Sequence, residues 1–106
     1  MKELELTKVS IQESEKSEEY ATSEAAIESI QTISAKYELP VLDALRIVSK
    51  KSVDTVSLGK DTPYVYFYAR KNNDSISFRI SERNRTIRFE LPLEADQLEI
   101  LRLRLS

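Results

Sequence analysis

Tyrosine and arginine side chains alternate with apolar ones between residues 63 and 91, and they are the residues best suited to binding chemistry. The segment contains three runs, Pro63–Arg70, Ser75–Ile80 and Arg85–Leu91. Each alternates with a period of two residues, which indicates antiparallel strands with two unlike faces. One face would be a core made of Val65, Phe67, Ala69, Ile76, Phe78, Ile80, Ile87, Phe89 and Leu91. The other would be polar, aromatic and basic.

An aromatic and basic sheet surface is typical of proteins that bind single-stranded nucleic acid, because bases stack on rings and arginines contact phosphates. Residues 70–88 also carry six basic and two acidic side chains, whereas the whole chain has a net charge of −2. Tyr66 and Tyr68 would stack bases, and the arginines would hold phosphates. The sequence therefore predicts a nucleic-acid-binding surface made of Tyr64, Tyr66, Tyr68, Arg70, Arg79, Arg85 and Arg88.

The same tyrosines have other interpretations. Tyrosine favours strands, and tyrosine–arginine pairs stabilise sheets without any ligand. The helices expected at residues 20–51 could cover this face, which would make the tyrosines part of the core. Tyrosine and arginine are also enriched at the centres of protein interfaces. The expected function is a small non-enzymatic regulatory protein that binds single-stranded DNA or RNA. The alternative is a protein–protein adaptor or inhibitor that uses the same face or the acidic N-terminal helix.

The residue types that are absent exclude several classes of chemistry. The chain has no cysteine, no histidine and one glycine, Gly59. Disulfides, Cys/His zinc sites, histidine triads and glycine-rich phosphate loops are therefore excluded. Carboxylate pairs such as Glu90 with Asp96, or Asp54 with Asp61, have no spacing that indicates a shared site. We expect no catalytic residue, no metal site and no cofactor.

The length of 106 residues, with 41% apolar and 32% charged residues, predicts a single soluble domain. No apolar run is long enough to span a bilayer, so we expect no membrane association. The N-terminus lacks the basic flank and apolar run of a secretion signal, so a cytoplasmic protein is expected.

Residues 1–19 are expected to form a flexible or edge-strand arm. The apolar alternation through Leu4 and Leu6 loses its phase at Val9. The segment Ser10–Glu19 is polar and acidic, which is typical of a solvated linker.

Residues 20–51 are expected to form a helical hairpin. Apolar residues recur every three or four positions up to Tyr37, and Ser23 is a candidate N-cap. Leu39 and Pro40 break the pattern, and a second helix would run from Pro40 to Lys51. Residues 33–47 also have the spacing of a helix-turn-helix motif. However, the turn carries Glu38 where glycine is usual, and the second helix begins with apolar residues, so a plain helix pair is favoured.

The sheet is expected to span residues 53–91 as a four-stranded antiparallel meander that begins with Val53–Leu58. A four-residue loop at Lys71–Asp74 would place Tyr68 opposite Ser77 and Tyr66 opposite Arg79.

A C-terminal helix is expected at residues 94–105, packed on the apolar face of the sheet, with a last strand at 100–105 as the alternative. This helix would be apolar on more than one side, which indicates a partner subunit. We therefore expect a homodimer through this helix or through an exposed sheet edge. The helix would contribute Leu98, Ile100, Leu101, Leu103 and Leu105.

The fold class predicted from these elements is α+β, with residues 20–106 forming one domain. The order of helical segment, four strands and C-terminal helix is similar to that of some sheet-based single-strand-binding proteins.

Overall fold

A computed structural model of the protein describes residues 3–13, 19–50, 53–60 and 64–106. These residues form one antiparallel sheet of six strands, in the order β2-β1-β6-β5-β4-β3, and three helices. In chain order the elements are β1 (Thr7–Glu13), β2 (Glu19–Tyr20), α1 (Ser23–Tyr37), α2 (Val41–Ser49), β3 (Thr55–Gly59), β4 (Tyr66–Lys71), β5 (Ser75–Glu82), β6 (Arg85–Pro92) and α3 (Ala95–Leu105).

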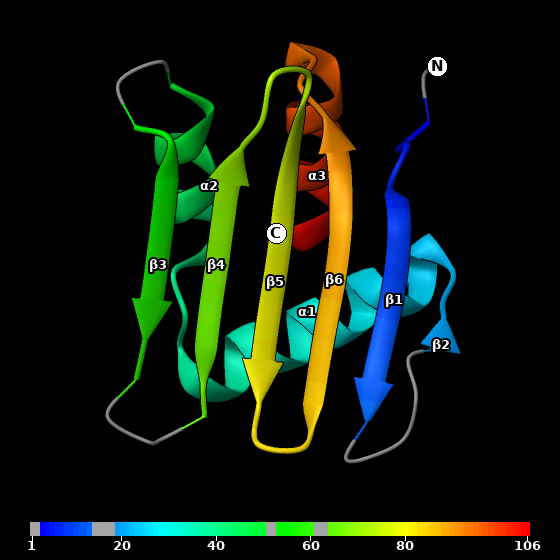
Figure 1. The fold of residues 1–106 in the computed structure, drawn as a ribbon, viewed down its shortest axis with the longest axis vertical. Coiled ribbons are helices and arrows are strands. Elements are labelled where there is room, and N and C mark those ends of the chain that lie inside the picture. Colours follow the sequence, from blue (N-terminus) through cyan, green and yellow to red (C-terminus); the bar gives the residue numbers. More distant parts are fainter. Residues whose placement is uncertain (1–2, 14–18, 51–52, 61–63) are drawn as a thin grey trace.

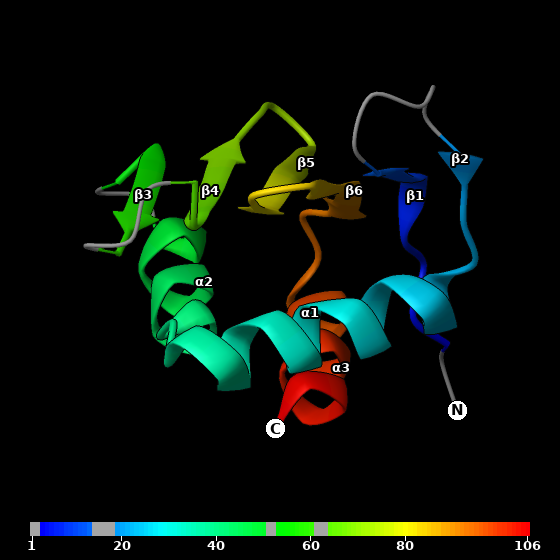
Figure 2. The same ribbon diagram turned by 90° about the horizontal axis from the view of Figure 1, so that it is seen from below.

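All three helices lie on one face of the sheet (Figures 1 and 2). α1 packs on β1, β6 and α3, whereas α2 packs on β3 and β4. The core lies between these two layers, where the inward side chains of the strands meet those of the helices. Its largest fully buried apolar side chains are Ile30, Ile33, Val48, Phe67, Ile76, Ile80, Ile87, Leu91 and Leu101.

The structure confirms the predicted α+β class, and β3, β4, β5 and β6 follow one another across the sheet as the meander requires. The prediction of four strands was wrong, because the N-terminal segment adds β1 and β2. Residues 10–13 were expected to be a solvated linker, but they belong to β1, which lies between β2 and β6. Residues 14–18 of that expected linker lie outside the described residues.

A β-bulge explains why the apolar alternation changes phase near Val9. Thr7 is opposite Glu90 and Ser10 is opposite Arg88, so β1 has one more residue than β6 between these pairs. Lys8 lies at this bulge and has a φ of 52°. Leu4 and Leu6 pack against the core before the bulge, and Val9 and Ile11 are buried after it. The phase change therefore keeps apolar side chains on the helix side along the whole segment.

The segment predicted to be a helical hairpin does form two helices, but they do not pack against each other as the two arms of a hairpin. The oxygen of Thr22, rather than Ser23, caps α1 by accepting a hydrogen bond from the Ala25 backbone N–H at 3.1 Å. Glu38 ends α1 in the left-handed conformation, and the buried Leu39 fills the turn before α2. α1 runs across the strands while α2 runs along β3 and β4 (Figure 1). Each helix therefore covers a different part of the sheet.

Residues 95–105 form α3 rather than the alternative last strand. Leu101 is 0% exposed, so its predicted place in a dimer surface was wrong, and Leu98 and Leu105 are half-buried against the core. They bury the helix within its own chain. Ile100 is half-buried, and Leu103 is 58% exposed on the outer side of the helix.

Gln97 on α3 forms hydrogen bonds with the chain segment that precedes β1. Its side chain is fully buried. The side-chain oxygen accepts a hydrogen bond from the Glu5 backbone N–H at 2.8 Å, and the side-chain nitrogen donates to the Glu3 carbonyl at 2.9 Å. The amide thus pairs with residues 3–5 as the backbone of a neighbouring strand would.

Replacing this amide will lower stability. Gln97→Met keeps the volume but leaves the Glu5 N–H and the Glu3 carbonyl without these partners, so we expect the free energy of unfolding to fall by about 2–3 kcal/mol. Urea denaturation measures this change. Gln31→Met is the matched control, because Gln31 is exposed on α1, where its side chain donates a hydrogen bond to the Arg104 carbonyl at the protein surface. Equal effects of the two substitutions would contradict the role given to Gln97.

Candidate functional site

The face of the sheet opposite the helices carries the predicted tyrosines and arginines, and none of the three helices covers it (Figure 2). We call this surface the open face. Strand alternation and register place on it Lys8, Ser10, Gln12, Tyr20, Thr55, Ser57, Tyr66, Tyr68, Arg70, Ser75, Ser77, Arg79, Ser81, Thr86, Arg88 and Glu90. The alternative in which the helices cover the tyrosines is therefore wrong.

Tyr66, Tyr68 and Arg79 form a compact cluster on this face. The two rings stack along β4 with centroids 6.3 Å apart and an angle of 18° between their planes. The Arg79 guanidinium carbon lies 5.2 Å from the centroid of the Tyr66 ring and 5.7 Å from that of Tyr68. These distances are within the range of cation–π attraction. The arginine therefore holds both rings in position at the sheet surface.

The strand register that creates this cluster differs from the predicted one. Tyr68 is opposite Arg79, and Tyr66 is opposite Ser81. The expectation that Tyr68 would face Ser77 was wrong, because β4 continues to Lys71 and pairs it with Ile76. On the other side of β5, Arg79 is opposite Arg88, so two arginines of the face are direct neighbours.

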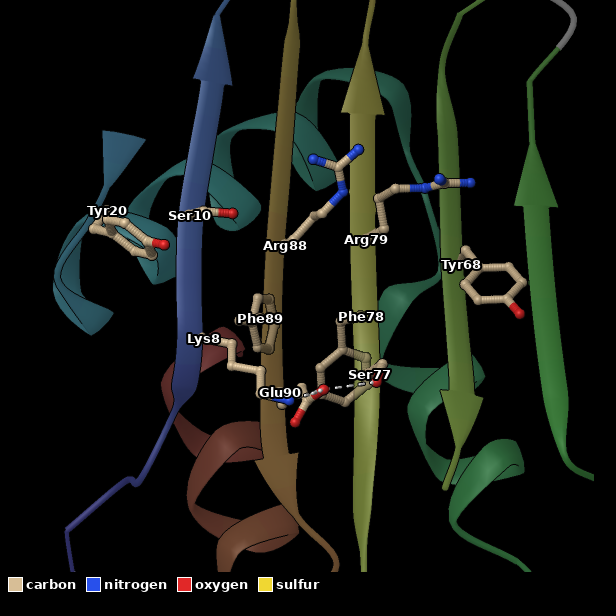
Figure 3. Close-up of a pocket in the computed structure, with 10 residues that line it drawn as sticks. All are labelled: Lys8, Ser10, Tyr20, Tyr68, Ser77, Phe78, Arg79, Arg88, Phe89 and Glu90. Carbon is tan, nitrogen blue, oxygen red and sulfur yellow. Dashed lines mark hydrogen bonds and ion pairs between the residues drawn. The ribbon is translucent and has the colours of Figure 1, made fainter. Parts of the chain in front are cut away.

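A depression of about 700 Å³ crosses the open face from β2 to β4 (Figure 3). Tyr20 lies at one end and Tyr68 at the other. Tyr20 is 90% exposed, whereas Tyr68 is half-buried. Between them the lining consists of Lys8, Ser10, Ser77, Phe78, Arg79, Arg88, Phe89 and Glu90. The depression thus offers an aromatic ring at each end and charged groups between them.

The charges on the strands of this face are mostly positive. Lys8, Arg70, Arg79 and Arg88 stand against one carboxylate, that of Glu90, among the described strand residues. Glu90 accepts hydrogen bonds from the Lys8 ammonium and the Ser77 hydroxyl, each at 3.4 Å. Arg88 donates to the Gln12 side-chain oxygen at 3.3 Å. These contacts link β1, β5 and β6 across the central part of the depression.

Four of the seven predicted binding residues come together at the depression and its tyrosine cluster: Tyr66, Tyr68, Arg79 and Arg88. Arg70 shares the face but is exposed near the end of β4. Tyr64 lies before β4 with a φ of 78° and is 66% exposed. Its ring is 5.8 Å from the guanidinium carbon of Arg83, in the turn between β5 and β6.

Arg85 does not belong to the open face, which corrects the prediction for this residue. It is in phase with the core residues Ile87 and Phe89 on β6, so its side chain turns toward the helices. Its Nη2 donates to the Ser29 hydroxyl of α1 at 2.8 Å, and its Nε lies 3.5 Å from a Glu13 carboxylate oxygen. Glu82, opposite Arg85, also turns to the helix side. On the helix side, the pKa of Lys36 is raised above its ordinary value. The larger cause is the Tyr37 hydroxyl, and the smaller is the Glu82 carboxylate.

The sequence interpretation missed Lys8, Ser10 and Tyr20, because it treated the N-terminal segment as an arm. The phase change at Val9 was the available signal, since a bulge restores alternation and places Lys8 and Ser10 beside Arg88 and Glu90. Tyr20 was expected to begin the helix, but it pairs with Ser10 in β2. No comparable signal in the sequence identifies this two-residue strand.

The arrangement suits binding through ring faces, guanidinium groups and hydroxyls. Within the described part of the chain, no group of three or more acidic, histidine or cysteine side chains is placed to hold a metal ion. Among the described helices, none has the length and apolar character needed to cross a membrane. Comparison of the chain with protein-family models, curated proteins and solved structures found no match.

The contact between Tyr68 and Arg79 should be measurable as a coupling energy. In a double-mutant cycle with Tyr68→Leu and Arg79→Met, we expect a coupling of about 0.5–1 kcal/mol in the free energy of unfolding, because each single change removes the cation–π contact. Urea denaturation of the four proteins measures it. The control cycle pairs Tyr68→Leu with Arg46→Met, because Arg46 is exposed on α2, on the other side of the sheet from Tyr68. A coupling of zero in the first cycle would contradict the contact.

Proposed function

We propose that the protein binds single-stranded DNA or RNA across its open face. The observation that carries this proposal is the uncovered sheet surface on which Arg79 holds Tyr66 and Tyr68, beside further cationic side chains. The sequence suggested these residue types. The structure adds support, because it leaves the face open and brings the aromatic and cationic groups within contact distance.

The chemistry of single strands fits this surface. Unpaired bases have free faces that stack on aromatic rings, each stacked base contributing about 1–3 kcal/mol. Tyr68 and Tyr20 offer rings at the two ends of the depression. Duplexes keep their base faces stacked inside the helix, so a platform of rings favours single strands.

The cationic groups would contact the phosphates of the same strand. Arg79 and Arg88 lie inside the depression, and Lys8 lies at its β1 side. Glu90 is the one carboxylate among the described residues that line the depression, and Lys8 is its partner in an ion pair at 3.4 Å. A path for the backbone along Arg88 and Arg79, away from Glu90, therefore has the favourable charge.

Binding to fluorescently labelled oligonucleotides tests the proposal. We expect anisotropy to rise with single-stranded DNA or RNA at low salt, and to rise much less with duplex DNA. Tyr68→Ala should weaken binding by about 1–3 kcal/mol, whereas Tyr68→Phe should retain it, because the stacking ring remains. Arg88→Ala should reduce the slope of log affinity against log salt by about 0.7.

Arg46→Ala is the matched control for the arginine substitution, because Arg46 is exposed on α2, on the helix side of the molecule. It should leave both affinity and salt slope unchanged. An absence of binding at low salt would overturn the proposal. In that case the alternative, a protein partner held by the same tyrosines and arginines, would become the leading function, and its binding would depend little on salt.

A further inference from the structure

The outer edge of β3 presents unpaired backbone groups. The backbone hydrogen bonds from Lys71 to Asp54 and from Lys60 to Val65, at 2.8 and 3.3 Å, bracket the ladder between β3 and β4. Bonded and non-bonded pairs alternate along an antiparallel ladder. Val56 and Leu58 therefore direct their N–H and C=O groups toward β4. Thr55, Ser57 and Gly59 direct theirs outward, and the described residues place no strand there.

The two edges of the sheet differ in how they resist further pairing. At one edge, β2 has two residues, and β1, the strand that pairs with it, is distorted by the bulge at Lys8. Short edge strands and bulges are devices that prevent strand addition. β3 has five residues, Thr-Val-Ser-Leu-Gly, with no charge, no proline and an unbroken register with β4. This edge is therefore suited to receive another strand.

We infer that β3 pairs antiparallel with β3 of a second copy of this chain. A two-fold axis beside Ser57 makes the strand complementary to itself: Ser57 faces Ser57 of the second copy, and Thr55 faces Gly59. All outward N–H and C=O groups of these three residues are then used, which gives six backbone hydrogen bonds. Registers shifted along the strand use fewer of them. Val56 meets Leu58 of the second copy on the helix side, so apolar side chains again pair with apolar ones.

An exposed apolar side chain lies next to this edge. Leu42, Arg46 and Ser49 of α2 line a groove shared with α3, so that side of α2 faces α3. Ile47 lies nearly opposite Leu42 and Ser49 on the helix, because successive residues turn by about 100°. Since α2 packs on β3 and β4 while α3 lies behind the middle of the sheet (Figure 1), the side of α2 that carries Ile47 is the side turned away from the middle of the sheet. Ile47 is 42% exposed, and a second copy would cover it.

The axis of such a dimer is perpendicular to the sheet. The helices of both copies then lie on the same side, and the two open faces join into one surface. The pairing itself uses backbone groups and the helix side of β3, so it does not depend on what the open face binds.

Sedimentation velocity tests the pairing. The parent protein should sediment as a dimer at high concentration and dissociate on dilution. Ser57→Lys and Ser57→Glu should each weaken self-association by about tenfold or more, because each places like charges opposite one another at the axis. An equal mixture of the two variants should associate again, because unlike charges then meet. Ser75→Lys is the matched control, because it adds the same charge to the open face on β5, away from the axis.

Circular dichroism of each variant establishes that it remains folded. Recovery of a dimer in the mixture supports the inference. A monomeric parent would overturn it. So would a parent dimer that Ser57→Lys leaves intact, since that dimer would use another surface. Single variants that are monomeric and do not associate when mixed would overturn the proposed register.

Discussion

Burial of one face of the sheet is the constraint on which the rest of this structure depends. The strict alternation of β4, β5 and β6 sends Phe67, Ile80 and Ile87 to one side. A face of this kind must be covered, and the three helices cover it together. With all the helices on that side, the tyrosines and arginines of the same strands are left on the surface. The open face is thus a consequence of where the core lies.

Much of this could be predicted from the sequence, because a period of two residues fixes which side chains share a face whatever the register. Tyr68 and Arg79 were placed on one face although their pairing was wrong by two residues. Pairing depends on where a turn begins, and Lys71 belongs to β4 rather than to the loop. Arg85 shows the limit of the argument: a charged residue in phase with Ile87 was assigned by its type rather than by its position.

The N-terminal segment could not be placed from local pattern, because its partners are distant in sequence. β1 pairs with β6, 72 to 83 residues away, and the bulge at Lys8 disrupts its alternation. From the sequence alone, Gln97 is a polar residue in the first turns of a helix and would be expected at the surface. In the structure it is buried, because its amide pairs with the backbone groups of residues 3–5. Tertiary pairing of this kind leaves little trace in either segment alone.

The energetics of Arg79 give a reason to look beyond stability for the role of the open face. Its Nε is buried and has no hydrogen-bond partner among the residues that the structure describes, which costs about 1–3 kcal/mol. Its contacts with the rings of Tyr66 and Tyr68 contribute about 0.5–1 kcal/mol each. The two effects are of similar size, so these contacts add little net stability to the fold. What arginine adds is a cation held against two ring faces on an uncovered sheet, and this combination suits a ligand that carries both negative charge and aromatic rings.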